Sequence, residues 1–274
     1  MKNKKRNLKL GLLFFVMLAM GATVFGWWQY RVRKWDGVTR FTIVTTDPLA
    51  LESIDPLTGE GIRIKVPMQM EINTAGGRGK WRAEVLPQLA QKFGGEWLTD
   101  SVMWHFEVPV TASDRDWSLW DKWEWFRHSR RVKWEEVNME ETTWVVSLTA
   151  PDGAKGFGLS DRWKDAARRR LVSTGLAREK LNVRVVNAAG AEGLGLRIGN
   201  MIETAGMRVV MVASGEEVAG ECEVQGGSGV KQSLGTLFLM RTFGCEWRES
   251  REENVGDVSL VLGKPFAAKW LGGD

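Results

Sequence analysis

The sequence of 274 residues is poor in the side chains from which metal sites and disulfide frameworks are built. It holds two cysteines, two histidines and a single tyrosine. Two cysteines exclude a disulfide-dense scaffold and a four-cysteine zinc site, and two histidines exclude a histidine-rich metal site. With 43% hydrophobic and 26% charged residues, the chain is neither disordered nor a multi-span membrane protein. The composition predicts no metal site and no cofactor. Tryptophan, by contrast, occurs 15 times.

Positive charge is confined to one end of the chain. Residues 1–40 hold nine basic side chains and one acidic side chain, a net charge of +8. The remaining 234 residues hold 29 basic and 33 acidic side chains, a net charge of −4. The isoelectric point near 9 therefore describes a short segment and not a basic surface. A nucleic-acid partner is not expected, because such proteins carry their positive charge across a binding face.

An uncharged segment runs from Leu10 to Trp28, between two basic clusters. At 1.5 Å per residue, these 19 residues reach about 28 Å, close to the hydrocarbon thickness of a bilayer. Aromatic residues Trp27, Trp28 and Tyr30 would sit at one membrane interface. The segment predicts a single transmembrane helix over residues 10–28, which anchors the protein in the cell membrane through the lipid bilayer.

The basic residues before this segment place residues 1–9 in the cytoplasm as a short tail, with the bulk of the chain outside. The alternative is a cleaved signal peptide. Signal peptides have a shorter apolar region and a small-residue cleavage site, to which Ala19-Met20-Gly21 is a poor match. In either case, the rest of the chain is exported.

Residues 41–112 predict a reduced α+β region. Three β-rich runs, 41–46, 49–54 and 61–66, are separated by turns and predict a hairpin arrangement. A Gly-rich loop precedes apolar residues at helical spacing over 81–93. Pro87 fits only in the first turn of a helix, so we expect this helix to start near Pro87. Residues 97–106 predict a second helix. Asp47, Asp55 and Glu60 flank the turns, where carboxylates are usually solvated, so we expect no catalysis from them.

Residues 113–180 are expected to form a Trp-rich helix, a strand at 143–149, a linker at 153–160 and a basic helix at 161–180. Within 113–134, Leu119, Trp120, Trp123 and Phe126 fall on one helical stripe, while Trp117 and Trp125 fall off it. The stripe predicts a core-facing side of an amphipathic helix. The alternative is a helix that lies on the membrane or stacks on sugar rings, with basic residues beside the aromatics.

Residues 181–274 predict a small α/β sandwich with helices packed on a mixed sheet, from a strand-helix-strand-strand-helix-strand-strand pattern. Asn187, Gly190 and Gly193 lie in a loop between the first strand and helix, where anion-binding loops occur. The loop matches neither the dinucleotide nor the P-loop motif, so its glycines could instead serve only a sharp turn. The overall fold class predicted for the chain is α/β.

Cys222 and Cys245 flank the second helix of this domain. In an exported domain they predict a disulfide bond, and the alternative is two free buried thiols.

Two stretches resemble the LytR-CpsA-Psr (LytR-type) cell-envelope family. Residues 181–266 resemble its C-terminal domain, through the opening NVRVVNAAGAEGLGLRIGN and the closing GDVSLVLGKPF. Residues 41–112 resemble its catalytic domain in reduced form, through SIDPLTGEGIRIKVP. Where the family has an Arg and an Asp after this motif, the chain has Met68 and Gln69. In such enzymes arginines hold the lipid pyrophosphate and aspartates hold magnesium. The resemblance therefore implies a reduced, inactive relative of these enzymes, and no catalytic residue is assigned. Arg78 and Arg82 are the nearby cations that would have to substitute.

The sequence leaves three functions open. The first is a non-catalytic, membrane-anchored envelope protein in cell-wall assembly or maintenance, which binds wall polymer or another envelope protein. The second is a glycopolymer transferase acting on a polyprenyl-pyrophosphate-linked substrate, against which Met68 and Gln69 argue. The third is a structural scaffold with the Trp-rich segment as its docking surface.

Overall fold

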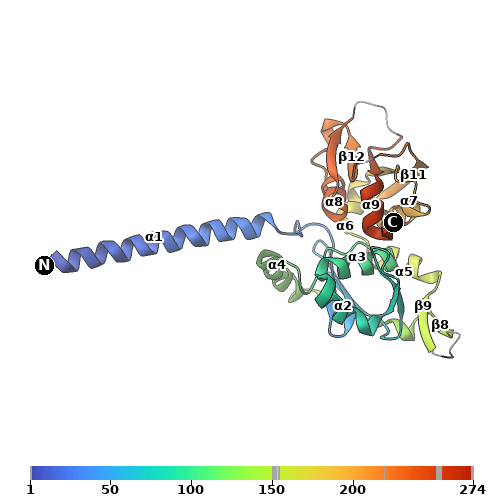
Figure 1. Cartoon of the computed structure of the whole chain (residues 1–274), viewed down its shortest axis with the longest axis horizontal. Coiled ribbons are helices and arrows are strands. Elements are labelled where there is room, and N and C mark those ends of the chain that lie inside the picture. The colour runs from blue at the N-terminus through green and yellow to red at the C-terminus, as the bar shows by residue number, and fades with distance from the viewer. Residues whose placement is uncertain (1, 150–152, 154, 219, 251–254, 273–274) are drawn as a thin grey trace.

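A computed structural model describes the chain except for residues 1, 150–152, 154, 219, 251–254 and 273–274, and for residues 2–14 it describes the backbone alone. The protein is a mixed α/β structure with two five-stranded sheets. Each sheet is the centre of one lobe: the first lobe spans residues 41–171 and the second lobe spans residues 182–271. Figure 1 shows the two lobes stacked against each other, with the long helix α1 projecting from them.

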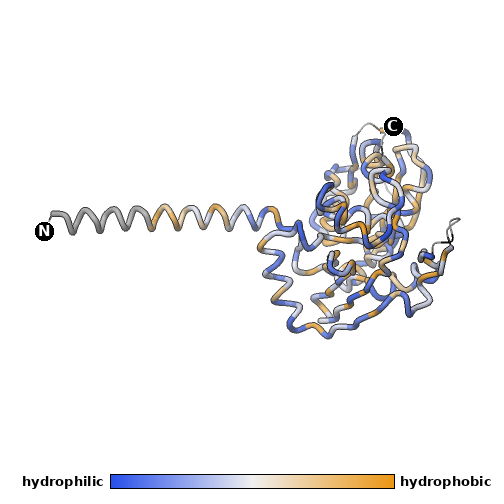
Figure 2. The backbone as a smooth tube through the Cα atoms, turned by 60° about the horizontal axis from the view of Figure 1, so that its bottom comes forward, coloured by the Kyte–Doolittle hydropathy of each residue, from blue (hydrophilic) through white to orange (hydrophobic). Residues whose placement is uncertain are grey.

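Helix α1 covers Lys2–Arg31 and extends away from both lobes as a single rod (Figures 1 and 2). No helix among the described residues is long and apolar enough to cross a membrane. The transmembrane helix expected over residues 10–28 therefore stays a prediction.

The large apolar side chains that are described in α1 are exposed around its whole circumference. A helix that packed on a protein core would bury one stripe of such residues. Here none of the large apolar residues is buried. They are Phe15, Val16, Met17, Leu18, Met20, Val24, Phe25, Trp27, Trp28 and Tyr30.

The first sheet has the strand order β6-β1-β2-β3-β7. Its centre is an antiparallel meander in which Phe41 pairs with Ile54 and Ile54 with Gly61, as the sequence predicts. β6 and β7 add in parallel at the two edges, so the sheet draws strands from both 41–112 and 113–180. The strands are β1 (Phe41–Thr46), β2 (Leu49–Asp55), β3 (Glu60–Lys65), β6 (Ala112–Ser113) and β7 (Lys133–Asn138).

Helices α2 (Leu86–Phe93) and α3 (Gly95–Phe106) cover one face of this sheet. The expected helix at 97–106 is confirmed. Within the helical spacing of 81–93, the helix starts at Leu86, next to Pro87 as expected. Residues 80–85 form other elements, because β4 (Glu71–Asn73) pairs with β5 (Lys80–Arg82) and the 3₁₀ turn η1 (Ala83–Val85) follows. Pro87 lies in the first turn of α2, where its missing N–H costs no helical hydrogen bond.

Helix α4 (Leu119–Ser129) exposes the face that its periodicity predicts to be buried, and its opposite face points to the core. Leu119, Trp120, Trp123 and Phe126 are 56, 40, 58 and 53% exposed. The two tryptophans off the stripe pack instead on a small core around Phe41. The core-facing prediction is therefore wrong.

The rotation of α4 has a polar cause. Asp121, on the side of α4 opposite the aromatic stripe, is fully buried, and its carboxylate accepts hydrogen bonds from the backbone N–H groups of Lys34 and Trp35 at 3.0–3.1 Å. It also completes a capping box with Ser118. A buried carboxylate needs such donors, so this bonding fixes which face of α4 points inward.

The segment that follows departs from the sequence prediction in two places. The expected strand forms as β8 (Val145–Thr149), but the expected linker at 153–160 is a strand, β9 (Lys155–Leu159), which pairs with β8. The expected single basic helix at 161–180 is two helices, α5 (Arg162–Arg170) and α6 (Thr174–Glu179). The chain breaks between them because Ser173 donates its N–H to Ala205 O, in the second lobe. The 3₁₀ turn η2 (Met139–Glu141) precedes β8.

The second sheet is mixed, as the sequence predicts, and the structure gives its strand order as β11-β10-β14-β12-β13. The apolar side of α7 is buried against it through Leu194, Ile198, Met201, Ile202 and Ala205. A C-terminal helix, α9, was not predicted. The elements are β10 (Asn182–Asn187), α7 (Leu194–Ala205), β11 (Arg208–Ser214), β12 (Cys222–Gly226), η3 (Ser228–Val230), α8 (Leu234–Phe243), β13 (Glu246–Glu249), β14 (Val258–Leu262) and α9 (Lys264–Leu271).

The predicted disulfide bond between Cys222 and Cys245 is present. It ties the start of β12 to the residue before β13, and both cysteines are buried.

Candidate functional site

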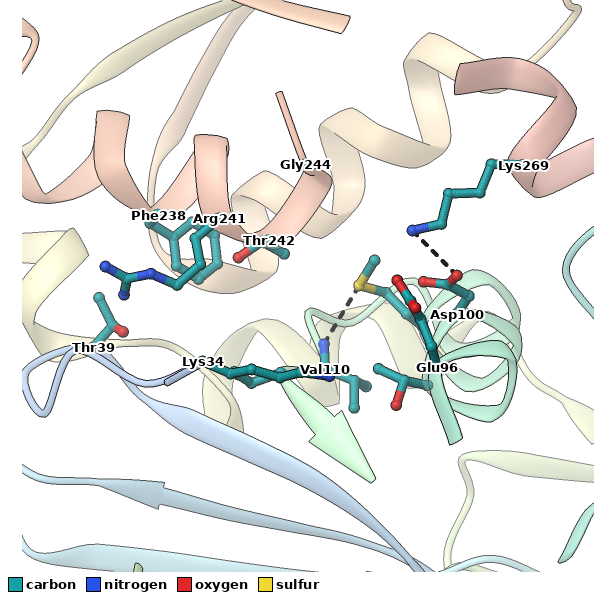
Figure 3. A pocket seen from close by; sticks show the side chains of 13 residues that line it. Lys34, Thr39, Glu96, Asp100, Val110, Phe238, Arg241, Thr242, Gly244 and Lys269 are labelled. Carbon is teal, nitrogen blue, oxygen red and sulfur yellow. Dashed lines mark hydrogen bonds and ion pairs between the residues drawn. The ribbon is translucent and has the colours of Figure 1, made fainter. Parts of the chain in front are cut away.

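A pocket of about 170 Å³ lies between the two lobes (Figure 3). The first lobe contributes α3 and the irregular segment before β6, and the second lobe contributes α8, Gly244 after it and α9. The segment between α1 and β1 adds Lys34 and Thr39. Apolar side chains form part of the wall and charged side chains of both signs line the rest. The lining residues are Lys34, Thr39, Glu96, Thr99, Asp100, Met103, Val110, Thr111, Phe238, Arg241, Thr242, Gly244 and Lys269.

The central charged pair of this pocket is Asp100 on α3 and Lys269 on α9, whose Nζ lies 3.2 Å from Asp100 Oδ2. The pKa of Asp100 is raised to about 6, chiefly by burial and to a smaller extent by the nearby Glu96, while Lys269 and Lys34 oppose the rise. A carboxyl group with a strongly shifted pKa in a cleft is a feature of functional sites. This pair also spans the lobes, so the pocket exists only in the folded two-lobe structure.

Two further cations at the pocket are held by carboxylates just outside it. Lys34 Nζ lies 3.0 Å from Asp116 Oδ2, and Arg241 Nη1 lies 3.0 Å from Asp36 Oδ2. Both side chains remain about one-third exposed. They can therefore donate hydrogen bonds to a ligand without first breaking a buried ion pair.

The chemistry of the pocket suits a polar, partly charged group. Ammonium and guanidinium donors, carboxylate acceptors and threonine hydroxyls surround an apolar patch formed by Met103, Val110 and Phe238. The volume is below the roughly 300–1,000 Å³ of pockets that enclose a whole small-molecule ligand. It matches one sugar or phosphate-sized unit of a longer chain.

The residues of the SIDP motif serve a different purpose. Asp55 is fully buried, contrary to the expectation of a solvated carboxylate, because it accepts the backbone N–H groups of Leu57 at 2.9 Å and Thr174 at 2.8 Å. Arg40, whose Nη2 lies 4.0 Å from Asp55 Oδ2, also donates to Val172 O at 2.7 Å. Burial lowers the pKa of Arg40. The motif thus fastens the first sheet to the chain that leads into the second lobe.

Arg78 and Arg82 do not line the interlobe pocket. The guanidinium of Arg78 stacks over the ring of Phe93 at 4.0 Å, and Arg82 lies 3.9 Å from Glu84. Met68 and Gln69 both expose their side chains. The structure does not bring the two arginines together with a carboxylate site at the motif.

The loop of Asn187, Gly190 and Gly193 lies at the far end of β10. The side-chain amide of Asn187 donates to Ala191 O at 2.6 Å and its oxygen accepts the N–H of Ala189 at 3.3 Å. Gly190 and Gly193 have φ of +70° and +74°, which L side chains rarely adopt. The turn therefore needs Asn and Gly at these positions for its own geometry. A role of Asn187, Gly190 and Gly193 in binding stays a prediction.

Sequence reasoning did not find the interlobe pocket. Glu96 and Asp100 are four residues apart in α3 (Gly95–Phe106), and this spacing puts both carboxylates on one face of the helix. The helix predicted at 97–106 begins one residue after Glu96, so the sequence did not indicate this pair. Lys269 lies on a helix that was not predicted, and no sequence pattern links it to Asp100. Within the described residues, no group of three or more potential ligands could hold a metal ion.

Comparison with known proteins found distant structural likenesses only. No protein-family model matches the chain, and no curated protein matches it. One similar structure is the LytR-CPS2A-psr family protein YwtF (TagT) with bound octaprenyl pyrophosphate lipid, at 13% identity and a TM-score of 0.25, covering 68% of this chain and 81% of that one. A crystal structure of TagT from B. subtilis has 11% identity and a TM-score of 0.24, covering 85% and 89%.

A third likeness is a transcriptional regulator from Enterococcus faecalis, at 12% identity and a TM-score of 0.23, covering 48% of this chain and 49% of that one. Structural neighbours therefore include LytR-CpsA-Psr proteins, the family that the sequence resembles. At these identities and TM-scores, the likeness carries no argument about fold, activity or ligand.

Proposed function

We propose that this chain is a membrane-anchored envelope protein outside the cytoplasm, and that its interlobe pocket binds one unit of a cell-wall polymer without altering it chemically. The observation that carries the proposal is the pocket itself. Both lobes supply its charged groups, around Asp100 and Lys269, and it has the size of one polymer unit. Its hydroxyl, ammonium and carboxylate groups match the hydroxyls and charges of a glycopolymer.

The membrane anchor is residues 10–28 of α1. Its support is the uncharged sequence from Leu10 to Trp28 and the all-round exposure of the described apolar side chains. Retention of the full chain in the membrane fraction after carbonate washing tests it. Release into the wash overturns it, and a mature protein whose mass lacks the N-terminal segment supports the cleaved signal peptide instead.

The non-catalytic part of the proposal rests on the first lobe. Between the sheet and helices α2 and α3, where a lipid-linked substrate would need a wide apolar groove, side chains fill the space. Those that pack there are buried: Val44, Leu51, Ile62, Ile64, Leu86, Leu98, Val102, Met103 and Phe106. At the motif, Met68 and Gln69 carry no charge with which to hold pyrophosphate or a metal ion.

Retention on purified sacculi tests polymer binding. The full chain in detergent is incubated with sacculi that keep their covalently attached anionic polymer and with sacculi stripped of it. We expect Lys269→Gln and Arg241→Gln to reduce retention several-fold. The control is Arg248→Gln, an exposed arginine on β13 paired with Glu223 and outside the pocket. Equal retention of all four proteins would overturn the assignment of the pocket.

The transferase remains the competing function and has its own readout. It requires Mg²⁺-dependent release of polyprenyl pyrophosphate from a lipid-linked substrate, reduced in Arg78→Ala or Arg82→Ala. Such turnover would replace the non-catalytic proposal. Absence of retention on either kind of sacculus, together with capture of another envelope protein that Trp120→Ala or Trp123→Ala abolishes, would favour the scaffold.

A further inference from the structure

Helix α4 exposes an aromatic face close to the end of α1. The face consists of Leu119, Trp120, Trp123 and Phe126, four large apolar side chains that are each at least 40% exposed. Contiguous exposed apolar surface of this kind marks an interaction site in a soluble lobe. The core under α4 is already complete through Trp117 and Trp125, so nothing within the lobe calls for this second apolar face.

Helix α4 is fixed to the end of α1. The backbone N–H of Leu119 donates to the side-chain oxygen of Gln29 at 2.9 Å, and the ring of Trp120 meets that of Tyr30 edge-on at 5.6 Å. Figure 1 shows α4 on the flank of the lobes from which α1 projects. The first turn of α4 therefore lies level with Trp27, Trp28 and Tyr30, which the proposed anchor places at the membrane interface.

Basic side chains border the aromatic face. Trp123, Phe126, Arg127, Arg130 and Arg131 surround a hollow of about 400 Å³. The guanidinium of Arg130 lies over the ring of Phe126 at 5.3 Å. Aromatic rings with arginines beside them are the composition of helices that lie at the boundary of lipid headgroups and acyl chains.

Most of this positive charge is available. Arg127 pairs with Glu124 on the same helix, and Glu124 also lies 3.6 Å from His128. Among the residues that the structure describes, no carboxylate lies within 4.0 Å of the guanidinium of Arg130 or Arg131. Guanidinium groups that lack a carboxylate partner and lie beside an apolar face favour phosphate groups at an anionic lipid surface.

We propose that α4 lies on the outer surface of the bilayer that anchors α1, with its aromatic face in the headgroup region and Arg130 and Arg131 on the phosphates of anionic lipids. This inference rests on the proposed anchor. Two attachments, a spanning helix and an interfacial helix, hold the lobes in one orientation. The interlobe pocket is then kept at a fixed height above the membrane.

The experiment reconstitutes the full chain into phosphatidylcholine vesicles with and without phosphatidylglycerol. Trp123→Cys carries an environment-sensitive nitrobenzoxadiazole label, and the native disulfide is kept by labelling without reductant. Leu196→Cys on α7, also an exposed apolar position, is the matched control. Phe126→Cys is a second reporter. Quenching by spin-labelled lipids measures how close each label lies to the bilayer.

We expect the labels at 123 and 126 to be quenched several-fold more than the label at 196, and more strongly when phosphatidylglycerol is present. Arg130→Glu with Arg131→Glu should bring quenching at 123 down toward the control. Carbonate washing of the same vesicles separates the two proposals. If the protein stays in the vesicles but the labels at 123 and 126 match the control, docking of α4 is wrong and the anchor stands.

Release of the protein by carbonate overturns the anchor, and the docking proposal with it. Labels at 123 and 126 that ignore lipid but change emission on addition of soluble wall glycan would assign the aromatic face to sugar stacking, which also overturns membrane docking.

Discussion

Replacing Asp100 by Asn tests whether the charged carboxylate of Asp100 in the interlobe pocket lowers the free energy of unfolding. Asp100 is largely buried between the lobes and its pKa is raised to about 6 from 3.8, chiefly because burial disfavours the charged carboxylate. A raised carboxyl pKa stabilises the fold fully below the unfolded pKa, and this stabilisation is lost as the pH rises through the folded pKa. The window for Asp100 is therefore about pH 4 to 6.

The magnitude follows from the two pKa values. Each pKa unit corresponds to about 1.4 kcal/mol, so the full difference is about 3 kcal/mol. Between pH 5 and pH 7, the part lost is about 1.3 kcal/mol in the free energy of unfolding. Asn cannot ionise, so Asp100→Asn should lack this loss. Lys269 loses its partner in the variant, but its side chain is 39% exposed and can turn to water.

Urea unfolding of the full chain in detergent, followed at pH 5 and pH 7, measures the effect. We expect the stability of Asp100→Asn relative to the native chain to be more favourable at pH 7 than at pH 5 by about 1.3 kcal/mol. In Lys269→Met, the pKa of Asp100 should rise further, since Lys269 opposes the shift. The reasoning would be refuted if the difference in stability between the variant and the native chain were the same at both pH values, or if it favoured the variant more at pH 5 than at pH 7.

Three further predictions concern the framework around the pocket. Reducing the bond between Cys222 and Cys245 should lower the free energy of unfolding by roughly 3 kcal/mol, measured by urea titration with and without reductant, because a loop of 23 residues is released. Asp55→Ala should cost about 3–5 kcal/mol in the same assay, because two backbone donors and the buried Arg40 lose their acceptor. Burial lowers the pKa of His105 from 6.5 to about 4, so neutral His105 supports the fold at pH 7 and the free energy of unfolding falls as the pH drops through this range. His105→Gln should remove about 2 kcal/mol of the decrease in this free energy between pH 7 and pH 5. An unchanged pH profile in that variant would contradict this assignment.

Local patterns were enough where one element decides its own structure. The meander of β1, β2 and β3 follows from β-branched runs with Gly and Pro between them, and α7 follows from apolar spacing that ends at Gly206, whose φ is +107°. Where an element needs a distant partner, the same patterns failed. Lys155–Leu159 reads as a linker because its glycines weaken strand propensity, yet pairing with β8 makes it a strand.

The candidate site could not be predicted from the sequence, because it too depends on contacts between distant parts of the chain. Asp100 and Lys269 are separated by most of the chain, and only the packing of α9 against α3 brings them to 3.2 Å. Charged residues at helical spacing usually mark a solvated face, so Glu96 and Asp100 gave no sign that a second lobe covers them. Burial, and with it the shifted pKa of Asp100, is a property of the two lobes together.

The sequence alone determined the features that depend only on composition and residue order. These are the scarcity of cysteine, histidine and tyrosine, the concentration of positive charge in residues 1–40 and the uncharged segment after Lys9. So was the position of the disulfide bond, since both cysteines flank one predicted helix. The tertiary structure decided which face of α4 is buried. Periodicity defines a stripe but not its direction, and the backbone donors that Asp121 requires lie at Lys34 and Trp35, which only the fold brings beside it.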